Sequence, residues 1–140
     1  MTRSVREIAA PRFWRDETLP FVEARSIQDG RKVCYAKHAH ETFSIGVITG
    51  GHSTYLNGKV LQRVGVGAVV VINPGEVHAC NPIDDQPWSY RMLNVEVPWL
   101  VRLQHELGFS QTLDFRAFST TLTTQPELYI GVESSLLRTD

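Results

Sequence analysis

GVGAVVVINPGEVH, residues 65–78, is the stretch from which the class of fold is predicted. Two glycines flank Val66, and the apolar run from Ala68 to Ile72 that follows shows no alternation, as is typical of a strand buried on both faces. Pro74-Gly75 then form a turn signal, and His78 comes shortly after it. A buried run bounded by turn residues at both ends predicts a β-sheet protein.

Further short strands surround this run, separated by turn residues. Gly50-Gly51 is expected to be a turn, and Asn57-Gly58 is a strong hairpin signal because both residues tolerate positive φ. Closely spaced strands of this kind predict a small sandwich or barrel. The expected strands are 21–27, 42–48, 52–56, 59–64, 68–72 and 88–97.

Two helices are expected after the last strand. The first begins at Pro98 and ends before Gly108, and the second opens near Pro126. Each has an apolar stripe, and we expect the stripes to pack on each other or on a second copy of the chain in a homodimer. Because the second stripe still continues near Asp140, we expect the natural protein to extend further. The stripes are Leu100, Leu103 and Leu107, and Leu128, Val132 and Leu136.

Composition and charge restrict the function. The chain has 140 residues, enough for one domain, and 14 basic against 15 acidic residues give a net charge of -1. Such a balance argues against a basic face that grips nucleic acid. The two cysteines, Cys34 and Cys80, form no metal-binding pair. No apolar run is long enough for a membrane span or a signal peptide, so a cytoplasmic protein without membrane contact is expected.

Three histidines form a candidate site. His38 and His40 are two residues apart on an expected strand, so their side chains leave the same face, and His78 follows the Pro74-Gly75 turn. These imidazoles could meet around a divalent metal at the mouth of a barrel. Alternatively, His38 and His40 are solvated strand-end residues and His78 caps a turn.

These residues also carry a resemblance. His38-x-His40 with Gly50, and Gly67 with Pro74-Gly75-x-x-His78, resemble the two short motifs of the cupin barrels. The segments FWRDETLPFVEARS, YAKHAHETFSIGVITGG, VVINPGEVHACNP and WSYRMLNVEVPWL resemble the N-terminal sensing domain of the arabinose-regulator (AraC) type of bacterial transcription factors, over about residues 13–107. The resemblance implies an effector-binding barrel, an arm that can fold over the ligand, helices that mediate dimerisation, and a separate DNA-binding half absent here.

The cupin resemblance is incomplete at one point. Enzymatic members add a glutamate a few residues after the second histidine of the first motif, where this chain has Ser44 and Ile45. Three histidines alone can hold Zn²⁺ or Ni²⁺ with an open position, whereas iron oxygenation is less favoured without the carboxylate. The alternative is that His38, His40 and His78 form hydrogen bonds with a polar ligand.

Alternation along the strands adds further ligand-binding candidates. If His38 and His40 face inward, Ser44 and Gly46 share their face, and Gly46 leaves room for a ligand. Tyr90 and Met92 would line the cavity, or else belong to the packed core. Trp14 could be a lid over the pocket or a simple anchor. The face that carries Tyr90 and Met92 consists of Trp88, Tyr90, Met92, Asn94 and Glu96.

The combined prediction is a mainly β, cupin-like barrel (jelly roll) followed by two α-helices. Residues 1–30 form an arm and first strand, 31–97 the effector-binding barrel, and 98–140 the helical dimerisation segment. The predicted function is the small-molecule sensing half of a transcription regulator, which is not an enzyme and reaches DNA only through the missing half. The alternative is a small metal-dependent cupin enzyme of the isomerase or dioxygenase type.

Overall fold

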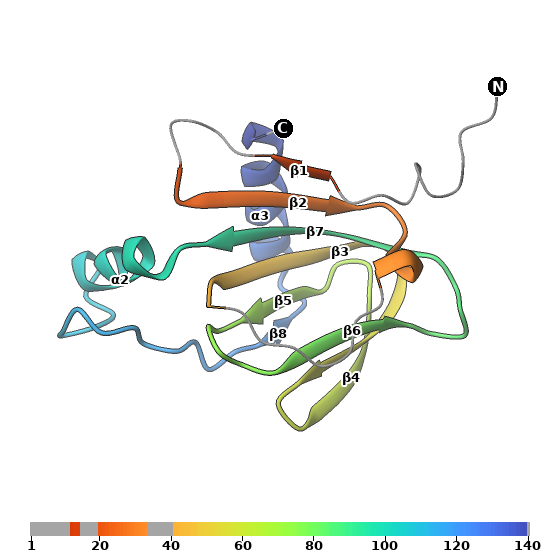
Figure 1. Ribbon diagram of the computed structural model, residues 1–140, viewed down its shortest axis with the longest axis horizontal. Helices are drawn as coiled ribbons and strands as arrows, with labels where there is room; N and C mark the ends of the chain where they lie inside the picture. Colours follow the sequence, from red (N-terminus) through yellow and green to blue (C-terminus); the bar gives the residue numbers. More distant parts are fainter. Residues whose placement is uncertain (1–11, 15–19, 34–40, 140) are drawn as a thin grey trace.

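The computed structural model describes residues 12–14, 20–33 and 41–139, except for the side chains of 12–14, 32–33 and 135–139. The expected fold class is confirmed, because this part is mainly antiparallel sheet and two helices follow the last long strand (Figure 1). The elements are β1 (Arg12–Trp14), β2 (Val22–Ile27), the 3₁₀ turn η1 (Gly30–Val33), β3 (Phe43–Asn57), β4 (Val60–Gly65), β5 (Val69–Ile72), β6 (His78–Pro82), β7 (Trp88–Val95), α2 (Val97–Glu106), β8 (Leu122–Thr123) and α3 (Pro126–Thr139).

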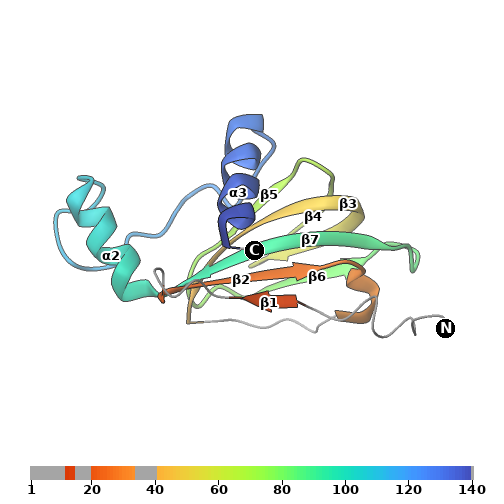
Figure 2. The same ribbon diagram turned by 90° about the horizontal axis from the view of Figure 1, so that it is seen from above.

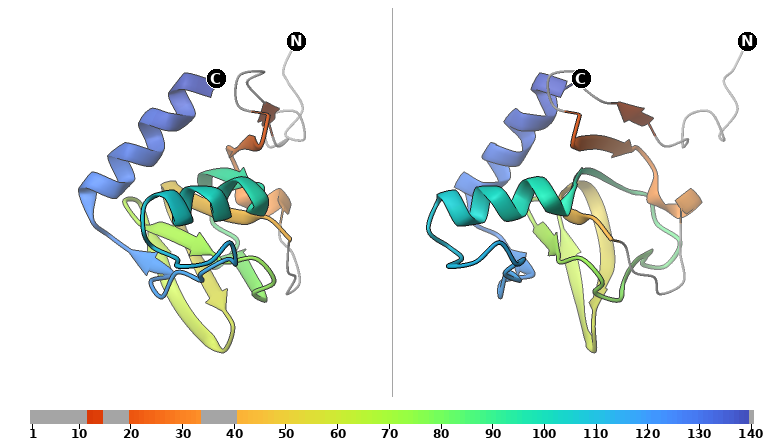
Figure 3. Two further views of the ribbon diagram at one scale, coloured as in Figure 1. Left: turned by 90° about the vertical axis from the view of Figure 1, so that its left-hand side faces the viewer. Right: turned by 60° about the vertical axis from the view of Figure 1, so that its left-hand side comes forward.

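The strand order explains how the barrel is assembled. One sheet runs β1-β2-β7-β3-β5-β8, and each neighbouring pair is antiparallel. β3 takes part twice, because its first half lies between β7 and β5 while its second half pairs with β4 and β6. Seen from the side, β4 and β6 turn away from β2 and β7, so that the two halves face each other across the interior (Figure 3).

The turn predicted at Gly50-Gly51 is wrong. β3 continues through both glycines, and its register against β7 shifts between Ile48 and Gly50. Gly51 has a φ of 67°, and a Cβ there would lie 3.0 Å from the Cα of Trp88. Glycine allows both the positive φ and the close approach, so the pair forms a bulge that bends the strand from one half of the barrel to the other.

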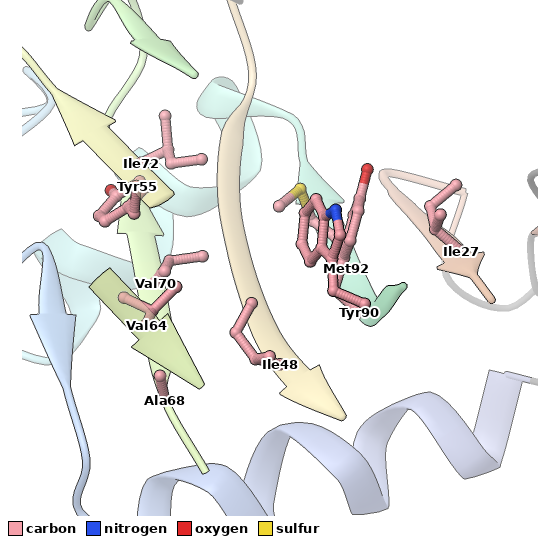
Figure 4. Packing of buried hydrophobic residues seen from close by; sticks show 10 residues of the cluster. Ile27, Ile48, Tyr55, Val64, Ala68, Val70, Ile72, Tyr90 and Met92 are labelled. Carbon is pink, nitrogen blue, oxygen red and sulfur yellow. The ribbon is translucent and has the colours of Figure 1, made fainter. Parts of the chain in front are cut away.

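Apolar side chains divide between the interior and the outer face of the sheet. The interior cluster draws on strands from both halves of the barrel (Figure 4). Side chains of the alternate positions point outward and lie under the helices, since successive residues of a strand face opposite ways. The interior cluster consists of Ile27, Ile48, Tyr55, Val64, Ala68, Val70, Ile72, Trp88, Tyr90 and Met92.

Helix α2 has the ends that the sequence predicted. Pro98 lies in its first turn, and Gly108, with a φ of 79°, follows shortly after its last residue. Leu100 is buried against Phe43 and its neighbours, and Leu103 is partly buried in the same cluster. Leu107 departs from the expected stripe: it is the C-cap residue and is 63% exposed, because the helix ends before it can turn toward the sheet.

Helix α3 packs on the sheet, which corrects the expectation for Val132. Its side chain is buried against Ala24, Val47 and Val69 on the outer face of the sheet, rather than on the stripe of α2. Figure 2 shows α3 standing on one side of the sheet, well separated from α2. Leu128 is 38% exposed, and the side chain of Leu136 lies outside the described part. Within that part, no helix has the length and apolar character needed to cross a bilayer.

Candidate ligand-binding site

A pocket of about 300 Å³ opens between β2, the start of β3 and β7. The lining residues of β2 and β7 form cross-strand pairs, here called rows. Arg25 and Met92 form the first row, and Glu23 and Asn94 form the second. Met92 is buried, whereas Glu96 is exposed, so the first row forms the inner end and Glu96 lies at the mouth. The lining residues are Phe21, Glu23, Arg25, Thr42, Met92, Asn94 and Glu96.

Ser44 supports the pocket from behind. Its side chain is fully buried, and its hydroxyl donates a hydrogen bond of 2.6 Å to Oδ1 of Asn94. An amide whose oxygen already accepts keeps its Nδ2 hydrogens for other partners. Ser44 was predicted to bind a ligand, and the structure places it against Asn94, which lines the pocket.

Gly46 lies directly opposite Met92 and makes room for its side chain. A Cβ at Gly46 would lie 3.0 Å from the terminal methyl of Met92 and 3.2 Å from the carbonyl oxygen of Arg91. The space that this glycine leaves is therefore used by Met92. Met92 both belongs to the interior cluster and lines the inner end of the pocket as its floor.

Tyr90 lies one row deeper than Met92, in the interior cluster. Its ring stacks on Trp88 with centroids 4.8 Å apart, and the guanidinium carbon of Arg25 lies 6.0 Å from its centroid. Tyr90 is thus packed in the core while contributing an aromatic face to Arg25, a cation–π arrangement that holds the guanidinium at the inner end of the pocket.

The mouth of the pocket is joined to helix α2. Glu96 is the N-cap residue of α2, but its side chain makes no capping hydrogen bond, and its backbone N–H donates to the carbonyl of Phe21 at 3.0 Å. Phe21 in turn stacks on Trp99 with centroids 4.4 Å apart. Phe21 and Glu96 therefore connect the lining of the pocket to helix α2.

Of the three predicted histidines, the structure describes only His78. It is buried on β6, where it lies opposite Asn57, and its Nδ1 lies 3.0 Å from the carbonyl oxygen of Glu76. A backbone carbonyl on Nδ1 orients many metal-binding imidazoles for ligation through Nε2, so the ring fits this role. His78 does not line the pocket between β2 and β7.

The remaining candidates fall outside the described part. His38 and His40 are not described, and Trp14 is placed by its backbone alone, opposite Ala24. Among the residues that the structure does describe, no group of three or more His, Cys, Asp or Glu side chains could hold a metal ion. Binding of Zn²⁺ or Ni²⁺ by His38, His40 and His78 therefore stays a prediction.

The partly buried thiol of Cys80 and the buried phenol of Tyr55 lie near His78 on the same wall. Burial raises the pKa of the Cys80 thiol to about 12, and it raises the pKa of Tyr55 to about 12 as well. The hydroxyl of Tyr55 donates to the carbonyl of Val71 at 3.2 Å and accepts from Nδ2 of Asn57 at 2.9 Å. Both groups are protonated near neutral pH, so neither supplies a thiolate or phenolate there.

Comparison with solved structures identifies the class of fold. A cupin 2 conserved barrel domain protein from Salinispora arenicola superposes with a TM-score of 0.57 at 13% identity, covering 76% of this chain and 96% of the other. A cupin-like protein from Thermotoga maritima gives 0.52 at 21% identity, with 62% and 68% covered. An oxalate decarboxylase variant from Bacillus subtilis gives 0.50 at 11% identity, with 70% and 32% covered. The fold is a cupin barrel.

The family follows from the sequence match. Residues 20–131 match the family described as the AraC-like ligand binding domain, and this chain belongs to that family. The matched range includes every residue that lines the described pocket. No protein of curated function matches the chain.

Proposed function

We propose that this chain is the effector-sensing part of a cytoplasmic bacterial transcription regulator of the AraC type. The observation that carries the proposal is the pocket between β2 and β7, in which one guanidinium, two carboxylates, an amide and a hydroxyl surround a thioether floor. Concave sites with an apolar floor and a few polar groups bind small molecules. In this proposal a separate helix-turn-helix half contacts DNA, and the net charge of -1 argues against nucleic-acid binding by this chain.

Both helices contact the strands that build the pocket, which supports a sensing role. α2 begins after Glu96 and is held by the stacking of Phe21 on Trp99. α3 lies on the outer face of the same sheet, where Nη1 of Arg91 lies 3.7 Å from Oε2 of Glu133. A ligand that binds more tightly to one arrangement of these strands than to another favours that arrangement. The helices then shift to the positions that accompany it.

Dimerisation is assigned to α3. Its buried face is occupied by the sheet through Val132, but Ile130 on the same helix is 62% exposed. A two-fold dimer that buries Ile130 would place two sensing domains, and the DNA-binding halves that follow them, in a fixed relation. Ligand-dependent movement of α3 would then change that relation.

The alternative is a small metal-dependent cupin enzyme. Ser44 stands in the region where enzymatic members carry a glutamate, and its hydroxyl is engaged by Asn94 inside the sheet. No carboxylate is available at that position to complete a three-histidine site. We therefore favour a sensor, with any metal at His38, His40 and His78 serving to hold a ligand.

The experiment is a binding screen with a blocked pocket. A panel of sugars, amino acids and small carboxylates is tested by thermal shift on the unaltered protein, on Thr42→Trp, which fills the mouth, and on Thr120→Trp at an exposed site. An effector at a hundred times its Kd should stabilise the folded state by about 2.7 kcal/mol. The stabilisation should persist in Thr120→Trp and disappear in Thr42→Trp.

Two outcomes would contradict the proposal. Equal stabilisation of both variants would place the binding site elsewhere in the molecule. Conversion of the bound compound during prolonged incubation, followed by NMR of the mixture, would favour the enzyme.

A further inference from the structure

The charged residues of the pocket are separated by sign along its length. Arg25 lies at the inner end beside Met92, and Glu23 lies one row further out beside Asn94. Residues of one face repeat every second position, so neighbouring rows are about 7 Å apart. Glu96 is exposed at the mouth, two residues after Asn94. The pocket therefore presents a positive inner end and a negative outer end.

Two of the lining residues, Arg25 and Asn94, present hydrogen-bond donors. The Arg25 guanidinium has only hydrogen-bond donors, and the ring of Tyr90 lies 6.0 Å from its carbon. Asn94 already uses Oδ1 to accept from Ser44, so its amide hydrogens are donors. The side chain of Met92, which lies opposite Arg25, provides an apolar floor that suits methylene groups.

Building on the proposed function, we propose that the pocket takes a small zwitterion whose carboxylate lies by Arg25 and whose ammonium group lies by Glu23 and Glu96. A simple anion would meet Arg25 but also the repulsion of Glu23 one row away. A simple amine would be attracted by Glu23 but repelled by Arg25. A zwitterion with a short chain between its charges pairs with both rows while its methylenes lie on Met92.

The test uses four probes of equal chain length. 5-Aminopentanoate carries both charges, pentanoate only the negative one, pentylamine only the positive one, and 1-pentanol neither. Isothermal titration at pH 7 with the full chain should show 5-aminopentanoate binding at least about tenfold more tightly than the other three. Equal or tighter binding of pentanoate, pentylamine or pentanol would overturn the inference.

Variants assign each charge. Arg25→Met should reduce binding of 5-aminopentanoate to that of pentylamine, and Glu23→Gln should reduce it to that of pentanoate. Arg25→Lys keeps the charge and should keep the preference for the zwitterion. The exposed residues Arg63 and Glu106 supply matched controls as Arg63→Met and Glu106→Gln, which should change nothing. Circular dichroism of each variant verifies that it is folded, and a folded Arg25→Met that retains the preference would refute the assignment.

The failure of this inference can be distinguished from failure of the proposed function. Xylitol, a neutral polyol, serves as the additional probe together with Thr42→Trp. If xylitol binds, Thr42→Trp abolishes that binding and 5-aminopentanoate shows no preference, the pocket is a sensor for neutral ligands and only the zwitterion is refuted. If Thr42→Trp reduces the binding of no probe and of no screened compound, both proposals fail.

Discussion

Ser44 and Asn94 are joined by a buried hydrogen bond of 2.6 Å, although they lie on different strands. The bond connects β3 to β7 and sets the side chain of Asn94 in the pocket wall. Ser44 has no exposed surface, and its hydroxyl is used in the hydrogen bond to Asn94. The pocket thus depends on a residue that does not line it.

Ser44→Ala should lower the free energy of unfolding by about 1–2 kcal/mol, because Oδ1 of Asn94 loses its buried donor. Urea denaturation measures the loss. Ser119 provides the control, since it is exposed and Ser119→Ala removes a hydroxyl that faces water. Equal midpoints for the two variants would show that the Ser44 bond contributes nothing.

Two glycine-to-alanine substitutions should have opposite signs. At Gly46 the new methyl would lie 3.0 Å from Cε of Met92 and 3.2 Å from the carbonyl oxygen of Arg91, so Gly46→Ala should cost about 1–3 kcal/mol and narrow the pocket. At Gly131 in α3 a Cβ meets nothing within 4 Å, so Gly131→Ala should stabilise by about 0.5–1 kcal/mol. Chemical denaturation of both variants measures the two changes in the free energy of unfolding. A Gly46→Ala variant as stable as Gly131→Ala would show that the surroundings of Gly46 have room for a methyl group.

Helix α3 offers two apolar residues with separate roles. Val132→Ala should destabilise the folded chain by about 2 kcal/mol, because it opens a cavity against Val47 and Val69. Ile130→Ala at an exposed position should change the stability of a single chain by less than about 0.5 kcal/mol. Sedimentation equilibrium should show a dimer that Ile130→Ala weakens. A monomer at high protein concentration would contradict the assignment of dimerisation to α3.

Alkaline pH should destabilise the protein. The folded state keeps the pKa of Cys80 and that of Tyr55 at about 12, against ordinary values of 9.0 and 10.0. Above about pH 9 the unfolded chain therefore binds fewer protons than the folded one, and stability falls as pH rises, by up to about 1.4 kcal/mol per pH unit for each group. In Cys80→Ala the decline should begin nearer to about pH 10, where the unfolded tyrosine titrates. An unchanged pH profile in that variant would show that the thiol makes no contribution.

The metal prediction can be tested by stoichiometry. After incubation with Zn²⁺ or Ni²⁺ and removal of unbound ion, the tag-free protein should retain one ion per chain if His38, His40 and His78 ligate it. His78→Ala should lower the affinity steeply, whereas His105→Ala should not, since His105 is exposed on α2. No retained metal would assign the histidines to another role without affecting the sensor proposal.

By itself the sequence determined the local elements of this protein. The strand over residues 69–72, the ends of α2 and the shared face of Met92, Asn94 and Glu96 follow from turn residues, capping preferences and period-two alternation. These signals act between residues a few positions apart, so they can be recognised without a partner strand. The turn wrongly predicted at Gly50-Gly51 shows the limit, because a bulge and a turn use the same glycines.

Only the tertiary structure decided which residues meet around the pocket. Glu23 and Arg25 flank Ala24 with the alternation of a strand, but their place in the wall depends on the pairing of β2 with β7. Likewise, Val132 was expected to pack on the other helix or on a second copy of the chain, and it packs on the sheet. Ser44 was predicted from its strand face, and only the pairing of β3 with β7 brings its hydroxyl to Asn94. Strand pairing and helix docking are set by burial of apolar surface between distant segments, a non-directional driving force that a periodic pattern does not assign to one partner.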